Sequence, residues 1–164
     1  MIEAQILLAE RLRKEGEKTL EFFQLLRAED WSRQVYTEGA CWTIHKVLIH
    51  FVNAEAGIYR LVANIIDGGV GVPEDFDLDR YNERKVDTLL DRSPETLLGE
   101  FKSLRQRTIA LTQSFEADDL DKIGRHPFLG LARVEDIVKL MYRHNQIHQR
   151  DIRRELKSPP NQFE

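Results

Sequence analysis

Two histidines stand four residues apart late in the chain, where a helical pattern of apolar residues predicts core side chains. The stretch RHNQIHQRDI, residues 143–152, places His144, Asn145 and His148 on the same arc of a helical wheel as the flanking apolar residues. Side chains at i and i+4 are neighbours on a helix, so these two imidazoles can bind one metal ion. A hydrogen-bonded polar network in the core is the alternative, because buried polar groups need partners.

A metal site needs a third ligand from another segment, and the chain contains three further histidines. His50 lies on the flank of an apolar stripe within residues 42–66 and can point into a groove between helices, so it is the predicted third ligand. His45 lies opposite that stripe and is expected in solvent, whereas His126 is expected at the surface or packed within a loop. A three-histidine site keeps a coordination position for water or substrate, as catalytic metal sites do.

Two carboxylates and an amide near these histidines limit the chemistry. Glu55 faces the predicted core and is expected to be an internal hydrogen-bond or salt-bridge partner, because it cannot easily share a metal with His50. Asp151 follows His148 by three residues and either orients that imidazole as a hydrogen-bond acceptor or lies in solvent. Zinc proteases carry a general-base glutamate directly after the first histidine, where this chain has Asn145. A protease of that type is therefore disfavoured.

The remaining reactive residue types give weaker indications. Arg143 and Arg150 belong to a charged stretch that is usually a solvated helix face, although either arginine can hold an anionic substrate near the histidines. Cys41 is the single cysteine, has no evident base beside it, and is interpreted as structural. No phosphate-binding glycine loop and no CxxC motif occur in the sequence.

Helical periodicity supplies the elements that must position the histidines. Long helices are predicted over about residues 2–27, 42–66, 93–115 and 133–157, with a short helix near 80–91. Ser93 and Pro94 form a helix-start signal, and the glycines after residue 66 form a stop signal. Strand signals are nearly absent, and residues 116–132 are expected to be a loop. The prediction is an all-α four-helix bundle with a long crossover connection between the second and third long helices.

Size and composition restrict the class of protein. The 164 residues are predicted to form a single domain, residues 1–164, and the net charge of -4 argues against a general nucleic-acid or membrane-surface binder. One cysteine permits no internal disulfide, which fits a reducing cytoplasm. The charged N-terminal segment does not resemble a signal peptide, and no apolar run reaches the ~20 residues needed to cross a bilayer. We therefore expect a cytoplasmic protein with no nucleic-acid and no membrane partner.

Three segments together resemble the DinB-like superfamily. CWTIHKVLIHFVNAE is similar to that family's second-helix motif, with Trp42 at the helix start and His50 eight residues later. YNERKVDTLLDRSPETLLGEF resembles the middle segment of the family. RHPFLGLARVEDIVKLMYRHNQIHQRDI resembles its closing segment, which ends in H-x3-H. No single motif is specific, but their order and spacing cover nearly the whole chain.

The resemblance implies a four-helix bundle, often dimeric, with a three-histidine site for a divalent metal. By this resemblance the ligands would be His50, His144 and His148, and the metal would be Zn, Ni, Fe or Mn without distinction. Related members include mycothiol-dependent maleylpyruvate isomerase and bacillithiol-type S-transferases. The first hypothesis is therefore a transferase or isomerase that uses a low-molecular-weight thiol and a small-molecule substrate. A metal-dependent hydrolase and a non-catalytic metal-binding stress-response protein are the alternatives, and a homodimer is compatible with each.

Overall fold

The computed structural model describes residues 2–159, which form five α-helices, two short 3-10 helices and one two-stranded hairpin. The four long helices are α1 (Ile2–Gln24), α2 (Ile44–Ile66), α4 (Pro94–Gln113) and α5 (Val134–Lys157). The shorter helix α3 (Leu78–Asp87) lies between α2 and α4 in the chain. The hairpin consists of β1 (Ile123–His126) and β2 (Gly130–Arg133), directly before α5.

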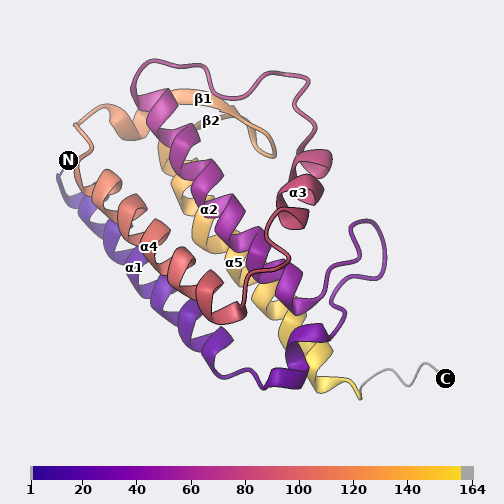
Figure 1. The fold of residues 1–164 in the computed structure, drawn as a ribbon. Coiled ribbons are helices and arrows are strands. Elements are labelled where there is room, and N and C mark those ends of the chain that lie inside the picture. Colours follow the sequence, from indigo (N-terminus) through magenta and orange to yellow (C-terminus); the bar gives the residue numbers. More distant parts are fainter. Residues whose placement is uncertain (1, 160–164) are drawn as a thin grey trace.

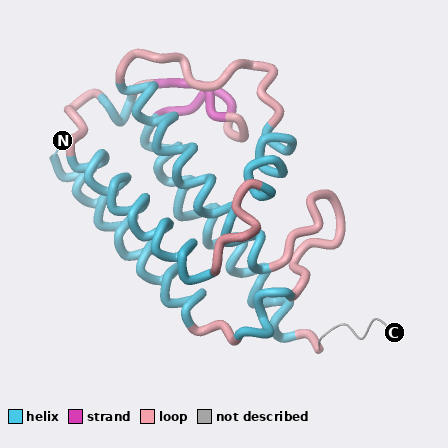
Figure 2. The backbone as a smooth tube through the Cα atoms, in the orientation of Figure 1, coloured by secondary structure: helices cyan, strands magenta, loops and turns pink. Residues whose placement is uncertain are grey.

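The four long helices form a bundle in which α1 and α2 each pack against both α4 and α5 (Figure 1). Helices α2 and α4 run in the same direction, so the chain must return along the bundle between them. Residues 67–93 form this return: one loop leads from α2 to α3, and a second loop leads from α3 to α4 (Figure 2). The predicted all-α four-helix bundle with a long second-to-third crossover is therefore confirmed.

Local capping explains where the helices begin. The Thr43 hydroxyl accepts a hydrogen bond from the Lys46 N–H at the start of α2, and Ser93 caps α4 in front of Pro94. The first helix ends at Gln24, three residues earlier than expected at residue 27, because a 3-10 helix follows at Ala28–Ser32. The short helix α3 starts at Leu78, two residues before the predicted position, because Asp77 caps it.

The interior consists of two apolar clusters separated by a polar layer. One cluster lies towards the hairpin end and includes Leu12, Val62, Ile109 and Met141, whereas the other includes Phe23, Phe51, Phe101 and Ile152. Between them every long helix contributes buried polar side chains: Glu15 and Thr19, Glu55, Arg105 and Thr108, Asn145 and Gln149. Polar groups at this depth require hydrogen-bond partners. The Gln149 amide, for example, donates to the Thr19 hydroxyl at 2.8 Å.

The segment expected to be a loop, residues 116–132, contains the antiparallel hairpin β1–β2. Each strand has only four residues, and the pairing depends on contacts with distant segments. Gly124 packs so closely on α2 that an added Cβ would lie 2.4 Å from the Ile65 side chain. The Arg125 carbonyl accepts a hydrogen bond of 3.0 Å from Val72, which attaches the crossover to the hairpin. The hairpin thus joins the crossover to the bundle, and sequence periodicity gave no signal for it.

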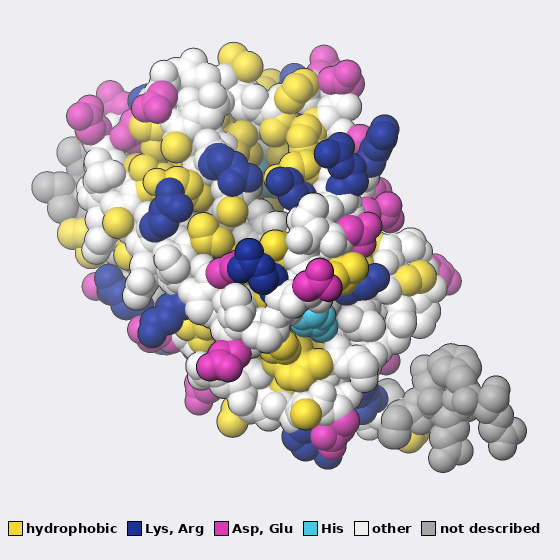
Figure 3. Space-filling view, in the orientation of Figure 1, with side chains coloured by type: hydrophobic (Ala, Val, Ile, Leu, Met, Phe, Trp, Pro, Cys, Tyr) yellow, Lys and Arg dark blue, Asp and Glu magenta, His cyan; other side chains and the backbone are white. Residues whose placement is uncertain are grey.

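Charges of both signs are mixed on the face of the molecule seen in Figure 3, with hydrophobic atoms between them. Within residues 2–159, each helix is too short or too polar to pass through a lipid bilayer.

Candidate metal centre

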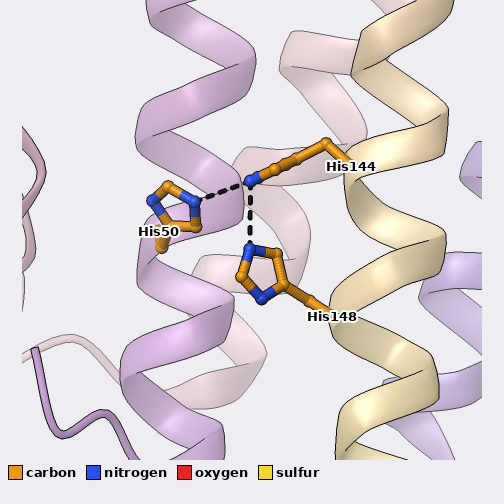
Figure 4. A group of neighbouring side chains, drawn as sticks. All are labelled: His50, His144 and His148. Atoms are coloured by element: carbon orange, nitrogen blue, oxygen red, sulfur yellow. Dashed lines mark hydrogen bonds between the residues drawn. The ribbon is translucent and has the colours of Figure 1, made fainter. Parts of the chain in front are cut away.

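The three predicted histidines meet in space. His50 comes from α2, and His144 and His148 come from successive turns of α5 (Figure 4). Nε2 of His144 lies 2.8 Å from Nε2 of His50 and 3.1 Å from Nε2 of His148. One nitrogen from each ring lies within 4.8 Å of the others. The antiparallel neighbours α2 and α5 therefore direct three imidazole nitrogens at one point.

Burial keeps these imidazoles uncharged. Desolvation lowers the pKa of His144 to about 3 and that of His148 to about 4. It also holds the pKa of His50 well below its ordinary value, and repulsion from the other two histidines acts in the same direction. Neutral imidazole is the form that binds metals. Three uncharged nitrogen atoms that point at one another interact more favourably with a cation than with each other. The donor set therefore fits a divalent metal ion.

A tyrosine that sequence reasoning missed holds one of the three rings. The Tyr36 hydroxyl lies 2.6 Å from Nδ1 of His148 and donates to Asp151 Oδ2 at 2.8 Å. Because its proton goes to the carboxylate, the hydroxyl accepts from the Nδ1–H of His148. That tautomer leaves Nε2 of His148 with a free lone pair directed at the site. Of the two roles considered for Asp151, the structure favours orientation of His148, which acts through Tyr36 and not by direct contact.

The other two histidines lie outside the cluster. His45 is partly exposed, and its Nε2 contacts the Arg92 carbonyl at 2.9 Å, so it is not simply solvated. His126 is buried at the end of β1, where Nδ1 accepts hydrogen bonds from the backbone N–H groups of Phe128 and Leu129. Of the two positions expected for His126, the structure shows packing within the hairpin and not the surface. Its burial lowers its pKa to about 4.

Glu55 is an ion-pair partner, as predicted, and not a metal ligand. Both of its carboxylate oxygens accept hydrogen bonds from Arg105, at 2.7 and 2.9 Å, and Thr108 adds a third at 3.1 Å. The Glu55 carboxylate is therefore occupied by Arg105 and Thr108. Asn145 belongs to the same buried polar layer, but its Nδ2 has no hydrogen-bond partner among the described residues.

The two arginines considered as anion-binding residues lie elsewhere. Arg143 and Arg150 are exposed on α5, and neither lines the pocket beside the histidines. Arg150 instead approaches Asp151, with 3.9 Å between Nε and Oδ1. Cys41 is also exposed, and its thiol contacts the Thr37 carbonyl in the loop before α2.

The histidines open into a pocket of about 500 Å³. Its walls come from α2, α3, the crossover, the hairpin turn and α5, so the hairpin and the long connection enclose the site. All three histidines line it, together with Tyr36 and His126. The Asn53 amide also faces this space, and its Nδ2 is buried with no hydrogen-bond partner within residues 2–159.

Comparisons with known proteins agree with this architecture. A family model described as the DinB superfamily matches residues 11–152. Among solved structures, YfiT from Bacillus subtilis superposes with a TM-score of 0.75 at 16% sequence identity, covering 92% of this chain and 85% of that one. YfiT is described as "a probable metal-dependent hydrolase with an unusual four-helix bundle topology". A search of curated protein sequences finds no match. At that identity the likeness to YfiT concerns the fold.

Proposed function

The chain belongs to the DinB superfamily, and from this premise we propose that it is a metal-dependent enzyme that transfers a low-molecular-weight thiol to an electrophile. His50, His144 and His148 would hold the metal, and the adjoining pocket would hold the two reactants. A divalent ion in such a site lowers the pKa of a thiol or water that binds to it. In the transfer, sulfur forms a bond to the electrophilic carbon, the leaving group departs with its electron pair, and the thiol proton passes to solvent.

The observation that favours a thiol over water is the state of the carboxylates around the histidines. Within residues 2–159, no Asp or Glu oxygen joins the cluster of three imidazole nitrogens. Asp151 is engaged by Tyr36, and Glu55 is engaged by Arg105. Hydrolysis needs a general base to take a proton from water in the reaction, whereas a thiolate is already a nucleophile. The arrangement therefore suits thiol transfer.

The chain's own residues contribute orientation and exclusion of water. Tyr36 fixes the ring and the tautomer of His148, so that its Nε2 presents a lone pair. Trp42 packs on His50 with 4.7 Å between ring centroids, and Phe51 packs against both other histidines. Phe51 covers two of the histidines on the side of the apolar core, and Trp42 forms part of the pocket wall beside His50. Reactants would then approach from the pocket.

Hydrolysis is the second candidate function, because the structural relative YfiT carries that description. In this chain the pocket-lining carboxylates Glu38 and Asp79 are the acids open to a bound reactant. Either one would have to serve as general base. Thiol-independent turnover of an ester or amide would favour this function.

Metal content and thiol dependence test the proposal together. The wild-type protein should bind about one divalent ion per chain by elemental analysis, and His50→Ala should reduce this strongly. His45→Ala is the matched control, because it removes a histidine from the same helix outside the cluster. The loaded protein is then mixed with monochlorobimane and a panel of bacillithiol, mycothiol, glutathione and coenzyme A, together with the cationic thiol cysteamine and the uncharged 2-mercaptoethanol. Stoichiometric metal with thiol-dependent fluorescence above the uncatalysed rate supports transfer, whereas no metal, or stoichiometric metal without such fluorescence from any thiol, overturns it.

A further inference from the structure

The walls of the pocket are mainly apolar. Carbon-rich side chains reach it from each element that forms it, among them Trp42, Ile58, Leu61, Phe76, Phe128 and Leu140. Such a surface stabilises a hydrocarbon or aromatic group by removing it from water. The pocket therefore offers most of its contact to an apolar part of the reactant, next to the histidines where the chemistry would take place.

The charged groups of the pocket are all acidic. Within the described residues, no lysine or arginine lines the space, whereas Glu38 and Asp79 do. Glu38 comes from the loop before α2 and Asp79 from α3, and both are exposed. Neither forms an ion pair within residues 2–159. Two carboxylates without cationic partners therefore flank the space through which a reactant enters.

The buried polar groups of the wall are uncharged hydrogen-bond donors. The Nδ2 of Asn53 is buried without a partner, one turn after His50 on α2. His126 accepts two backbone N–H bonds at Nδ1, so its remaining proton is on Nε2. These groups can bind a carbonyl, ether or hydroxyl oxygen. They do not neutralise a carboxylate or a phosphate, which beyond the reach of a metal on the histidines would lose its hydration without gaining a counter-charge.

We infer that the pocket selects reactants without negative charge: uncharged molecules, or amines, with an apolar chain that reaches from the histidines to Glu38 and Asp79. The inference rests on the proposed function and narrows its substrate class. A cationic end group gains from the two carboxylates, an uncharged one is tolerated, and an anionic one is repelled. Anionic thiols are then poor partners even though their sulfur is chemically suitable.

Three thiols of equal chain length test this selection, namely 6-amino-1-hexanethiol, 6-mercapto-1-hexanol and 6-mercaptohexanoate. The protein is loaded with Co²⁺, and each dissociation constant is measured from the sulfur-to-cobalt charge-transfer absorption. At low ionic strength we expect the carboxylate to bind about tenfold more weakly than the alcohol and the amine to bind at least as tightly as the alcohol, as a charge contact of about 1.4 kcal/mol would give. The six-carbon spacer keeps the end group off the metal.

Charge-neutralising variants locate the effect. Glu38→Gln combined with Asp79→Asn should remove most of the difference between the amine and the carboxylate. Glu10→Gln combined with Asp118→Asn changes the net charge equally at exposed positions outside the pocket, and should leave the difference intact.

The possible results separate the two proposals. Equal or tighter binding of the carboxylate would overturn the charge selection and leave the proposed function standing. A difference that persists in the Glu38 and Asp79 double variant would also overturn it. No cobalt uptake, or no charge-transfer absorption with any of the three thiols, would overturn the proposed function itself, and the selection with it.

Discussion

Replacing Arg105 with methionine should destabilise the protein strongly, because it leaves a buried carboxylate without its counter-charge. Arg105 and Glu55 are almost wholly buried, with side-chain exposures of 4% and 2%. The guanidinium donates to both oxygens of Glu55 and, at 3.0 Å, to the Leu12 carbonyl of α1. After the substitution Glu55 keeps one hydrogen bond, from Thr108. The methionine fills much of the space of the arginine stem, so the effect reports on charge and hydrogen bonding.

The size of the loss follows from these contacts. Each of the two hydrogen bonds to the carboxylate contributes roughly 1.5–3 kcal/mol, and breaking a buried ion pair from one side typically costs about 3–5 kcal/mol. We therefore expect the free energy of unfolding to fall by about 4 kcal/mol. For a domain of this size that corresponds to a decrease in Tm of about 8–16 °C. Replacing both Glu55 and Arg105 with methionine should recover most of the loss, because no buried charge remains.

Urea unfolding of the metal-free protein, followed by circular dichroism, measures these differences. Arg105→Met, Glu55→Met and the double variant are compared with wild type as a double-mutant cycle, with the m-value required to stay constant. Lys102→Met, an exposed substitution on the same helix, is the control and should leave the midpoint unchanged. A loss below about 1 kcal/mol in Arg105→Met, or a double variant less stable than the single one, would contradict the reasoning.

Four further substitutions have effects that the structure specifies. Tyr36→Phe should weaken metal binding by about 10-fold or more, measured against a chromophoric chelator, because His148 loses its orienting partner. The pKa of His126 is lowered to about 4 from an ordinary 6.5, so the unfolded chain takes up more protons between these pH values and stability falls as the pH falls. Between about pH 7.5 and about pH 5, the free energy of unfolding of His126→Asn should therefore fall by about 2 kcal/mol less than that of wild type. Gly16→Ala should destabilise α1, since its Cβ would lie 2.9 Å from Arg105 Cγ, whereas Gly99→Ala should stabilise α4 by about 0.5–1 kcal/mol, since nothing lies within 4 Å.

Each of these expectations can fail in a distinct way. Unchanged metal affinity in Tyr36→Phe would mean that the hydroxyl does not orient the ring. Parallel pH profiles of wild type and His126→Asn, measured by urea unfolding, would mean that His126 titrates equally in the folded and unfolded chains. Equal shifts in Tm for Gly16→Ala and Gly99→Ala would mean that the guanidinium stem moves aside at no cost.

The three histidines were predictable because helical geometry sets the face on which each one lies, although their meeting also requires α2 to pack against α5. His144 and His148 share a face by their spacing, and the apolar stripe of α2 indicates which side His50 presents. Helix starts were likewise readable, since Ser93 and Pro94 act on their own first turn. These are local signals, and each is complete within a few residues of sequence.

The parts that were missed depend on contacts between distant segments. Tyr36 lies in a loop with no periodicity, and its partner His148 is 112 residues away. Arg105 was not predicted to be buried, because the carboxylate that neutralises it, Glu55, lies on another helix. The hairpin is attached by a β-bridge between Gly71 of the crossover and Arg125 and by the packing of Gly124 on Ile65, and the strand residues reveal neither contact. That no lysine or arginine among the described residues lines the pocket could likewise be recognised only once the position of the crossover was known.

The buried polar layer fixes the axial position of the helix that presents His50. Glu55 meets Arg105 of α4 at a single axial height, so a shift of α2 by one turn, about 5.4 Å, would move the carboxylate into an apolar cluster without a counter-charge. His50 precedes Glu55 by five residues on the same rigid helix, and the ion pair therefore sets its height as well. The three imidazoles therefore converge as a result of folding alone. With metal binding as proposed, the ion would enter and leave a preassembled site while the bundle stays folded.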